Sequence, residues 1–386
     1  MPAPILDASA MAGTLVGRVW RNDKHGPAVV TLRDGMLSDI TSVAAPTVSA
    51  LLQRPDALDY VKTFTGEAIG KLEAVAAASD GRADADTTHF LAPCDLQAIK
   101  ACGVTFAQSM VERVIEEKAA GNADRAAAIR QRIGSLIGDS LANLKAGSEE
   151  AARVKQALIA EGVWSQYLEV GIGPDAEVFT KSPVLSAVGW GAEIGIHSSS
   201  SWNNPEPEIV LAVNSQGQVK GASLGNDVNL RDIEGRSALL LGKAKDNNAS
   251  CAIGPFIRLF DQSWGLDDVR QAQLQLTVKG EDGFVLDGHS AMNKISRDPL
   301  DLVAQTCGQH HQYPDGFMLF LGTLFAPTKD REAPGQGFTH KLGDEVTISA
   351  TGLGALRNVV RHSHHCAPWT FGVSALMKNL AARGLL

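Results

Sequence analysis

The sequence predicts a β-rich α+β protein with a small N-terminal domain and a larger domain whose sheet is closed or strongly curled. Short apolar segments that alternate with Gly, Asn and Asp turns after residue 163 predict most of the strands. The stretch 113–162 is rich in Ala, Glu and Arg and predicts a helical insertion. The polar segment 79–89 predicts the domain boundary, which gives a small domain over 1–88 and a large one over 89–386.

The elements are expected in the following order. Alternating apolar residues over 13–41 predict strands, and 47–53 and 55–77 are expected to form short helices. Gly121-Asn122 predicts a break within the helical insertion. The helical spacing there rests on Met110, Val114, Ile115, Ala127, Ile129, Ile133, Leu136 and Ile137. Later strands are expected at FTKSP, EIVLAV, GASLGND, LQLTV, FVLDG, MLFLG and EVTIS.

Composition excludes several classes of partner. With 35 basic and 43 acidic residues the net charge is −8, which disfavours binding to nucleic acid or to an anionic membrane. Five cysteines form no CxxC pair and indicate a reducing compartment rather than a disulfide framework. No apolar run approaches the roughly 18 residues of a membrane span, and the N-terminus lacks a secretory pattern. We expect a soluble, cytoplasmic protein.

The first candidate site is Glu206-Pro207-Glu208, at the start of the strand segment IVLAV. In a strand, residues i and i+2 face the same side, so the two carboxylates would lie about 7 Å apart. Burying both in ionised form is costly unless a cation lies between them. Carboxylate oxygens suit Mg²⁺, Mn²⁺ or Ca²⁺ better than Zn²⁺. The alternative is a solvent-facing strand start, where Pro207 excludes pairing in the middle of a sheet.

A second candidate follows about twenty residues later, where the strand GASL runs into a polar turn. Asp227 is a candidate third oxygen ligand, and Arg231 could pair with Asp232 to brace it. The alternative is an ordinary Asn-Asp turn after a strand. Lys245 stands among small polar residues before a Gly-Pro turn, and it gains significance only if these acids form a site.

Taken together, these motifs resemble the fumarylacetoacetate hydrolase superfamily over roughly residues 90–360. The matching phrases are Glu-x-Glu, GNDVNLRDIE, Lys245 with SCAIGP, FTKSP, PDGFMLFLGT and LGDEVTI. The resemblance implies a catalytic domain of mixed β-roll or barrel character and a homodimer or higher homo-oligomer. It implies that Glu206, Glu208 and Asp227 bind Mg²⁺ or Mn²⁺ and that Lys245 is the active-site lysine. The residues it suggests for substrate binding are Thr323, Arg231 and Lys181.

One segment departs from the family pattern. Hydrolases of this family carry GxNYxxHxxE, whereas here Thr105 stands at the Asn position and Ser109 at the His position, with Glu112 retained. Without the imidazole, a base that titrates near neutral pH is missing, which argues against C–C bond hydrolysis. Ser109-x-x-Glu112 also fits a helix capping box, so Glu112 could serve in catalysis, in capping, or in both.

With Ser in place of His and a long helical insertion, the chain resembles the branch of 2-keto-3-deoxy-pentonate (arabinonate or xylonate) dehydratases. The phrases WSQYLEVGIGPDAEVFTK, WNNPEPE and QHHQYPDGF carry this resemblance. It implies dehydration of a 2-keto-3-deoxy sugar acid to 2,5-dioxopentanoate in non-phosphorylating pentose breakdown.

The residues suit this chemistry. A 2-keto acid can chelate Mg²⁺ through its C1 carboxylate and C2 ketone. Glu112 is the candidate base for a C3 proton, and Lys245 would stabilise the developing negative charge. Two candidates stay open for the acid that protonates the leaving C4 hydroxyl. One is Ser109 acting through a water, and the other is Glu112, which would return the proton that it took from C3.

Two other functions stay open. The chain could hydrolyse the C–C bond of a 2,4-diketo-3-deoxy sugar acid with Glu112 alone activating water, or it could bind sugar acids without catalysis. Two further histidine segments are interpreted as structural. The tract 361–366 has the composition of a metal tract but is expected to be an exposed loop. His310-His311 is expected to pack beside a turn, with one imidazole near the substrate hydroxyls as the alternative.

Overall fold

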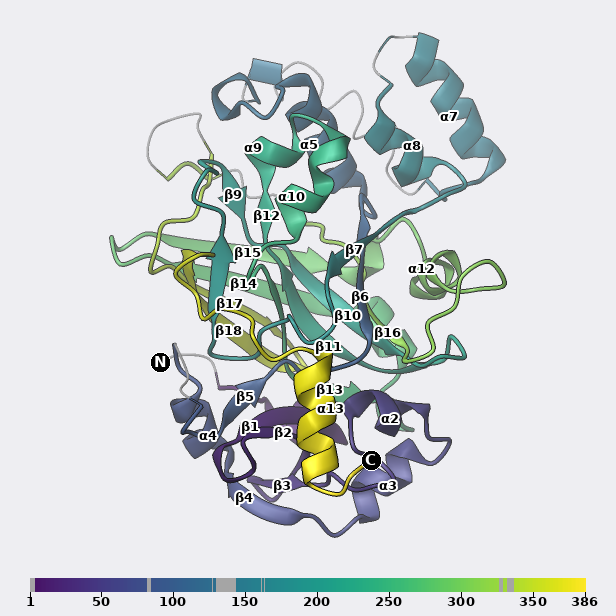
Figure 1. Ribbon diagram of the computed structural model, residues 1–386. Helices are drawn as coiled ribbons and strands as arrows, with labels where there is room; N and C mark the ends of the chain where they lie inside the picture. Colours follow the sequence, from purple (N-terminus) through teal and green to yellow (C-terminus); the bar gives the residue numbers. More distant parts are fainter. Residues whose placement is uncertain are drawn as a thin grey trace.

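The computed structural model describes residues 4–81, 85–126, 128–129, 144–160, 162, 164–325, 329–331 and 337–386. The described part is a strand-rich mixture of several sheets and helices (Figure 1), which confirms the predicted β-rich α+β class. None of its helices has both the length and the apolar character needed to cross a membrane.

The largest sheet in the described part of the chain has the order β4-β3-β2-β1-β13-β11-β10-β16-β6-β7, with β5 also paired to β1. Strand β1 pairs with β13, so the N-terminal strands extend the sheet that holds the later ones. The domain boundary near residue 88 stays a prediction. The strands are β1 (Leu15–Arg21), β2 (Gly26–Arg33), β3 (Met36–Asp39), β4 (Glu67–Lys71), β5 (His89–Leu91), β6 (Ala98–Gly103), β7 (Glu177–Ser182), β10 (Pro207–Val213), β11 (Val219–Asp227), β13 (Cys251–Leu259) and β16 (Phe317–Phe320).

A second sheet has the order β15-β14-β17-β18-β8, and β12 and β9 form a short ribbon. In the larger of these two sheets, buried residues alternate with more exposed ones along β14. Leu274, Leu276 and Val278 are buried, as expected for an antiparallel strand with one face on the core. The bounds are β8 (Glu193–Ile196), β14 (Gln273–Lys279), β15 (Val285–Ala291), β17 (Glu345–Ala350) and β18 (Gly354–His362), with β9 (Asn203–Asn204) and β12 (Asn229–Leu230) in the ribbon.

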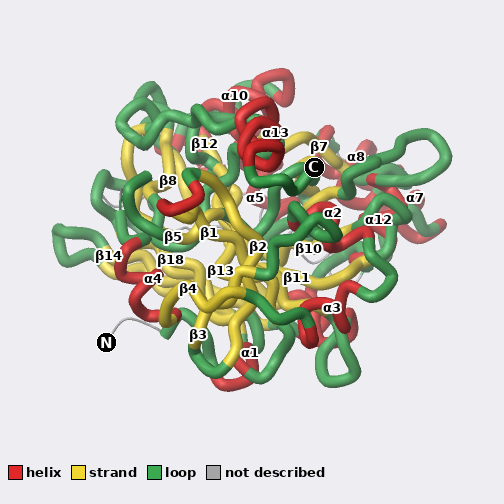
Figure 2. Tube along the Cα trace, turned by 60° about the horizontal axis from the view of Figure 1, so that its bottom comes forward, coloured by secondary structure: helices red, strands yellow, loops and turns green. Residues whose placement is uncertain are grey.

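Helices surround the sheets, as the tube of Figure 2 shows with strands in the middle and helices toward the periphery. Helices α5, α9 and α10 lie over one end of the sheets, in the upper part of Figure 1. The helices are α1 (Ala8–Met11), α2 (Val48–Gln53), α3 (Ala57–Thr63), α4 (Leu72–Ala78), α5 (Ala107–Lys118), α7 (Glu149–Ala160), α8 (Gln166–Ile172), α9 (Arg231–Glu234), α10 (Leu241–Lys245), α11 (Leu266–Gln271), α12 (Pro299–Thr306) and α13 (Val373–Ala382), with 3₁₀ turns η1 (Asn22–Lys24), η2 (Ala238–Leu240) and η3 (Met292–Lys294).

Strand β10 is the centre of the core. All seven of its residues are buried, and it pairs with β11 on one side and β16 on the other. Ile209, Leu211 and Val213 pack into one hydrophobic cluster, while Val210 and Ala212 pack into a second. Because side chains alternate along a strand, both faces of β10 are covered, and the sequence therefore reads as an uninterrupted apolar run.

Two expectations from the sequence need correction or qualification. The helix predicted over 55–77 is wrong in its middle, where β4 pairs with β3 at the edge of the sheet and Glu67 forms an ion pair with Arg21 at 2.7 Å. In the predicted insertion, α5 begins at Ala107 and α7 spans Glu149–Ala160. Ala127, Ile133, Leu136 and Ile137 lie outside the described residues.

Candidate active site

Three buried carboxylates meet where β10 begins and β11 ends. The antiparallel register pairs Glu208 with Gly225, and the Asp227 N–H donates to the Glu206 carbonyl oxygen at 3.1 Å. One carboxylate oxygen from each of Glu206, Glu208 and Asp227 lies within 4.8 Å of the others, and each residue is 5% exposed or less. The alternative of a solvent-facing strand start is therefore wrong. Pro207 is the first residue of β10, where a missing N–H is tolerated within a central strand.

Cationic side chains surround two of the three carboxylates. The Lys245 ammonium contacts Glu206 and lies 3.1 Å from Asp227 Oδ2, while Lys181 Nζ lies 2.8 Å from Asp227 Oδ1. Burial alone would raise the pKa of Asp227, but Lys181 and Lys245 outweigh it and hold that pKa below its ordinary value. Burial alone would lower the pKa of Lys245, but Asp227 and Glu206 raise it, so Lys245 stays charged.

Glu208 has a different environment. Its Oε2 accepts a hydrogen bond from the Gly322 N–H at 2.6 Å, and no cationic side chain in the described part forms an ion pair with it. Burial, followed by the nearby charges of Asp227 and Glu206, raises the pKa of Glu208 well above its ordinary value. Of the three carboxylates, Glu208 therefore stands to gain most from a bound cation.

The hydrogen bond to Glu208 depends on glycine at position 322. Gly322 has φ of +89°, and a Cβ there would lie 2.0 Å from Thr105 Oγ1. Replacing Gly322 with alanine is therefore expected to lower the free energy of unfolding by more than the ~1–3 kcal/mol of backbone strain alone. Chemical denaturation measures the loss. Gly217→Ala is the matched control, because Gly217 has φ of +74° with open space around it; an equal loss in both variants would contradict the steric argument.

Two adjoining cavities, one larger than the other, open onto this cluster. They share the wall residues Ser109, Arg113, Glu206 and Thr323. The larger one is also lined by Cys102, Gly103, Val104, Glu177, Phe179, Glu208, Asp227, Glu234, Lys245 and Gly322, and the smaller one by Glu112, Glu116, Asn204, Arg231 and Phe325. The structure thus brings together eight of the nine site residues predicted from the sequence.

Lys181 is the exception. It is fully buried and is not among the described residues that line either cavity. Its ammonium pairs with Asp227 and contacts the Lys245 carbonyl oxygen, with the Val228 carbonyl oxygen at 3.2 Å. This position does not fit the predicted contact with substrate. Lys181 instead ties the end of β11 to the end of α10, which fits a positioning role for Asp227 and Lys245.

Ser109 and Glu112 lie on one face of α5, which begins with Phe106 as its N-cap and has no side-chain cap. The Ser109 hydroxyl donates to the Phe106 carbonyl oxygen at 2.9 Å, and Glu112 forms an ion pair with Arg231 at 3.4 Å. The capping-box interpretation is therefore wrong, because both residues lie inside the helix. Their side chains instead line the smaller cavity.

Arg231 does not brace Asp232 as predicted. Its guanidinium lies 2.7 Å from Glu116 and 4.2 Å from the centre of the Trp202 ring. The Asp232 carboxylate accepts hydrogen bonds from the Ser200 hydroxyl and the Ser201 N–H. Arg231 therefore connects α9 to α5 through Glu116, which lies one helical turn after Glu112.

Sequence reasoning gave no role to four charged residues of the site, Arg113, Glu116, Glu177 and Glu234, although the last two lie in the matching phrases WSQYLEVGIGPDAEVFTK and GNDVNLRDIE. Arg113 donates to Glu206 Oε1 at 2.6 Å and pairs with Glu116 and Glu234 at 2.6 and 2.8 Å. One sequence signal could have identified Arg113 and Glu116 as site residues. Their helical spacing puts them on the same face as Ser109 and Glu112. Arg113, however, lies 93 residues from Glu206 in sequence, and no local pattern joins them.

The cluster as a whole carries excess negative charge. Among the described residues, seven carboxyl groups face four cationic side chains, which leaves three negative charges when all are ionised. A divalent cation would reduce the excess to one, so the donor set fits a metal bound by oxygen ligands. The groups counted are Glu112, Glu116, Glu177, Glu206, Glu208, Asp227 and Glu234 against Arg113, Lys181, Arg231 and Lys245.

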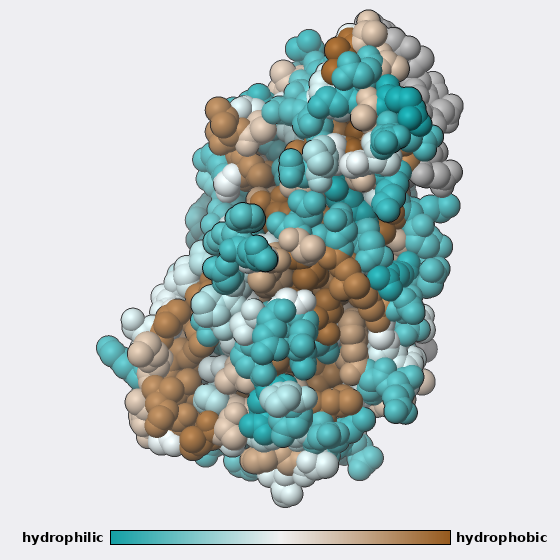
Figure 3. Space-filling model, turned by 90° about the vertical axis from the view of Figure 1, so that its right-hand side faces the viewer, coloured by the Kyte–Doolittle hydropathy of each residue, from teal (hydrophilic) through white to brown (hydrophobic). Residues whose placement is uncertain are grey.

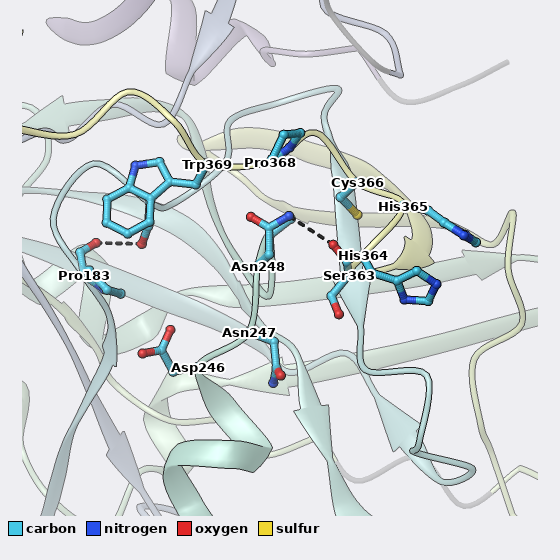
Figure 4. A pocket seen from close by; sticks show the side chains of 12 residues that line it. Pro183, Asp246, Asn247, Asn248, Ser363, His364, His365, Cys366, Pro368 and Trp369 are labelled. Carbon is cyan, nitrogen blue, oxygen red and sulfur yellow. Dashed lines mark hydrogen bonds between the residues drawn. The ribbon is translucent and has the colours of Figure 1, made fainter. Parts of the chain in front are cut away.

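The histidine-rich tract borders a third cavity, which shares no wall residue with the two described above (Figure 4). His364 and His365 lie at its edge with Trp369, and Asn248 donates to the Ser363 carbonyl oxygen. In the described part of the chain, the acidic triad is the group whose geometry suits a metal, so the tract is not supported as a metal site. The His311 ring packs against Tyr313, at 4.7 Å between centres, as expected.

The chain is similar to known proteins in sequence and fold. A family model described as the fumarylacetoacetate (FAA) hydrolase C-terminal region matches residues 139–361. The chain is 29% identical over 194 residues to a probable 2-keto-3-deoxyxylonate dehydratase of Haloferax volcanii, covering 50% of this chain and 63% of that protein. It is 28% identical over 219 residues to the 2-dehydro-3-deoxy-D-arabinonate dehydratase of Saccharolobus solfataricus, covering 57% and 68%.

A solved structure shares the fold. It is a 2-keto-3-deoxy-D-arabinonate dehydratase complexed with magnesium and 2,5-dioxopentanoate. The TM-score is 0.62 at 20% sequence identity, covering 90% of this chain and 99% of that one.

Proposed function

Because the chain belongs to the fumarylacetoacetate hydrolase family, we propose that it is a Mg²⁺-dependent hydro-lyase that converts a 2-keto-3-deoxy-pentonate to 2,5-dioxopentanoate. The names of the two curated relatives and the ligands of the solved relative support this substrate class. The observation that carries the proposal is a buried acidic triad beside two cavities whose described walls contain no histidine.

The triad supplies the metal site in this proposal. Glu206, Glu208 and Asp227 would hold Mg²⁺, or Mn²⁺ with the same preference for oxygen ligands. Bound there, the metal supplies a Lewis acid that makes the protons next to a 2-keto group more acidic. Lys245 already spans Glu206 and Asp227, so its ammonium lies where it would stabilise negative charge that develops on the substrate.

The proton chemistry falls to α5. Glu112 lines the cavity that adjoins the triad and would remove the C3 proton. The C4 hydroxyl then lies β to the carbonyl and leaves as water, after which the unsaturated product tautomerises to the C5 aldehyde. No water has to attack carbon in this sequence, so Ser109 in place of a basic imidazole is compatible with it. Thr323 and Arg231, both on the cavity walls, are the proposed substrate contacts.

A substrate panel tests the proposal. Purified protein with Mg²⁺ is expected to turn over 2-keto-3-deoxy-pentonates of one or both C4 configurations, with EDTA or Glu206→Ala abolishing the activity. The panel also includes 2-keto-3-deoxy-hexonates, and mass spectrometry of the products shows which sugar acids are substrates. Turnover that persists in EDTA would contradict the metal-dependent mechanism, and no turnover of any sugar acid would leave the binding-protein alternative.

The oligomeric state is part of the same proposal. The family resemblance implies a homodimer or higher homo-oligomer. On the face shown in Figure 3, hydrophobic side chains gather into patches between hydrophilic areas, and such patches are typical of surfaces that meet another protein.

A further inference from the structure

The third cavity, beside the histidine-rich tract, has no part in the proposed reaction. Its described walls come from the segments that follow β7 and α10 and from the segment between β18 and α13. Among its described lining residues there is one acidic residue, Asp246, and neither a lysine nor an arginine. The two cavities at the triad, by contrast, are lined by Arg113, Arg231 and Lys245. A sugar acid in the third cavity would therefore find no lysine or arginine to pair with its carboxylate.

Trp369 lines this cavity with its indole ring (Figure 4). The residue is 45% exposed, and no described aromatic ring or cationic group packs against it. Its Nε1–H donates to the Phe371 carbonyl oxygen at 3.1 Å, which fixes the orientation of the ring. Because the face of an indole carries partial negative charge, it attracts the C–H bonds on one face of a sugar ring. An aromatic ring held in this way is typical of a small-molecule site.

Two hydrogen-bond acceptors lie beside the ring. The Asp246 carboxylate has no hydrogen bond or ion pair with another described side chain. The Asn248 amide nitrogen donates to the carbonyl oxygens of Ser363 and Ala367 at 3.0 and 3.1 Å, and no described residue donates to its amide oxygen. In Figure 4 this oxygen points toward the Trp369 ring, and the Asp246 carboxylate points toward the same space. Free acceptors beside an aromatic face suit a ligand that carries hydroxyl groups, which donate.

The backbone that carries these acceptors is strained and held in place. Ala249, which also lines the cavity, has φ of +60°, in the left-handed region that disfavours a residue with a Cβ. The Gly195 N–H donates to the Ala249 carbonyl oxygen at 3.0 Å, and the Ser250 hydroxyl donates to the Lys245 carbonyl oxygen at 2.8 Å. Strain of this kind is concentrated at ligand-binding segments, where the surrounding contacts maintain it. Acceptors that are already in position lower the cost of binding.

We propose that the third cavity is a binding site for a neutral sugar. One C–H face of the sugar ring lies on Trp369, and its hydroxyl groups donate to the Asp246 carboxylate and the Asn248 amide oxygen. The carboxylate disfavours an anionic ligand, which separates this site from the triad, where cationic side chains and a metal suit a sugar acid. The site is independent of the proposed dehydratase function.

Saturation-transfer NMR and calorimetry with D-xylose, D-glucose and D-galactose test the site. Trp369→Ala and Asp246→Ala are each expected to weaken binding of the best of these sugars by about tenfold or more. Trp369→Phe keeps an aromatic face and should stay within about threefold of the wild type. Asp175→Ala, at another exposed carboxylate, is the matched control and should bind as the wild type does. Urea unfolding of each variant checks that the fold is retained.

The assignment is overturned if none of the three sugars binds, or if both alanine variants bind the best sugar as tightly as the wild type does. D-gluconate, the charged counterpart of D-glucose, tests the ligand class. Gluconate binding that Trp369→Ala abolishes would show that the cavity takes sugar acids and would contradict the preference for a neutral ligand. These titrations need no turnover, so a wild-type protein inactive on every sugar acid would overturn the proposed function without affecting this test.

Discussion

Replacing Glu208 with glutamine is expected to abolish Mg²⁺-dependent turnover while leaving the metal-free protein at least as stable as the wild type. Glu208 is buried, lacks an ion-pair partner in the described part of the chain and has a pKa raised by burial and by Asp227. The neutral amide can still accept the Gly322 hydrogen bond and cannot take on the charge that burial and Asp227 disfavour, so the fold loses nothing. The metal site loses one of its three carboxylates, which should cost more than the ~100-fold typical of an outer-sphere partner.

Thermal unfolding with and without Mg²⁺ measures both effects. Wild-type protein should be stabilised by about 2.7 kcal/mol at a Mg²⁺ concentration a hundred times the dissociation constant. Glu208→Gln should show no such shift, whereas Glu281→Gln, at an exposed position, should behave as the wild type. A Glu208→Gln protein that keeps both the Mg²⁺ shift and its turnover would show that the triad is not the metal site.

Replacing Lys245 with methionine is expected to destabilise the metal-free protein by about 3–5 kcal/mol, because Glu206 and Asp227 lose the cation that they share. Removing one member of a buried ion cluster leaves the remaining charges uncompensated, which is far more costly than losing an exposed pair. Added Mg²⁺ should recover part of this stability by neutralising the same carboxylates. Even with Mg²⁺ added, the turnover of Lys245→Met should stay about 10²-fold or more below that of the wild type, since the stabilising ammonium is absent.

Lys243→Met is the matched control for this experiment. Lys243 lies two residues away on α10, but its side chain is exposed. Urea unfolding of the two variants, each with and without Mg²⁺, separates stability from catalysis. If Lys245→Met unfolds at the same denaturant concentration as Lys243→Met, the ammonium does not compensate the acidic cluster.

The metal triad could be predicted from the sequence because its geometry is local. Glu206 and Glu208 are two residues apart at the start of an apolar strand, and strand periodicity puts them on one face. Asp227 follows from the antiparallel pairing of the next strand with the first. The same reasoning identified β10 by its consecutive apolar residues and β11 by the segment GASL that runs into a polar turn.

The rest of the site depends on contacts between elements far apart in the sequence. Arg113 reaches Glu206 only because α5 packs over the end of β10, and Glu177 enters the cavity only because β7 pairs with β6 at a glycine. The motif FTKSP identifies Lys181 as a residue of the family pattern but does not tell which way its side chain points. The sequence therefore could not predict that this side chain is fully buried against Asp227. Strand β4 was missed because both of its faces are largely exposed and no alternation marks it.

The central claim, that this site eliminates water and does not hydrolyse a C–C bond, is tested most directly by one NMR experiment. Purified protein and Mg²⁺ are added to a mixture of ¹³C-labelled 2-keto-3-deoxy-pentonate and a 2,4-diketo-3-deoxy sugar acid, and both are followed in time. The account predicts that the first is consumed and gives 2,5-dioxopentanoate, while the second persists. Formation of pyruvate and a hydroxy acid from the second, with the first unchanged, would contradict it.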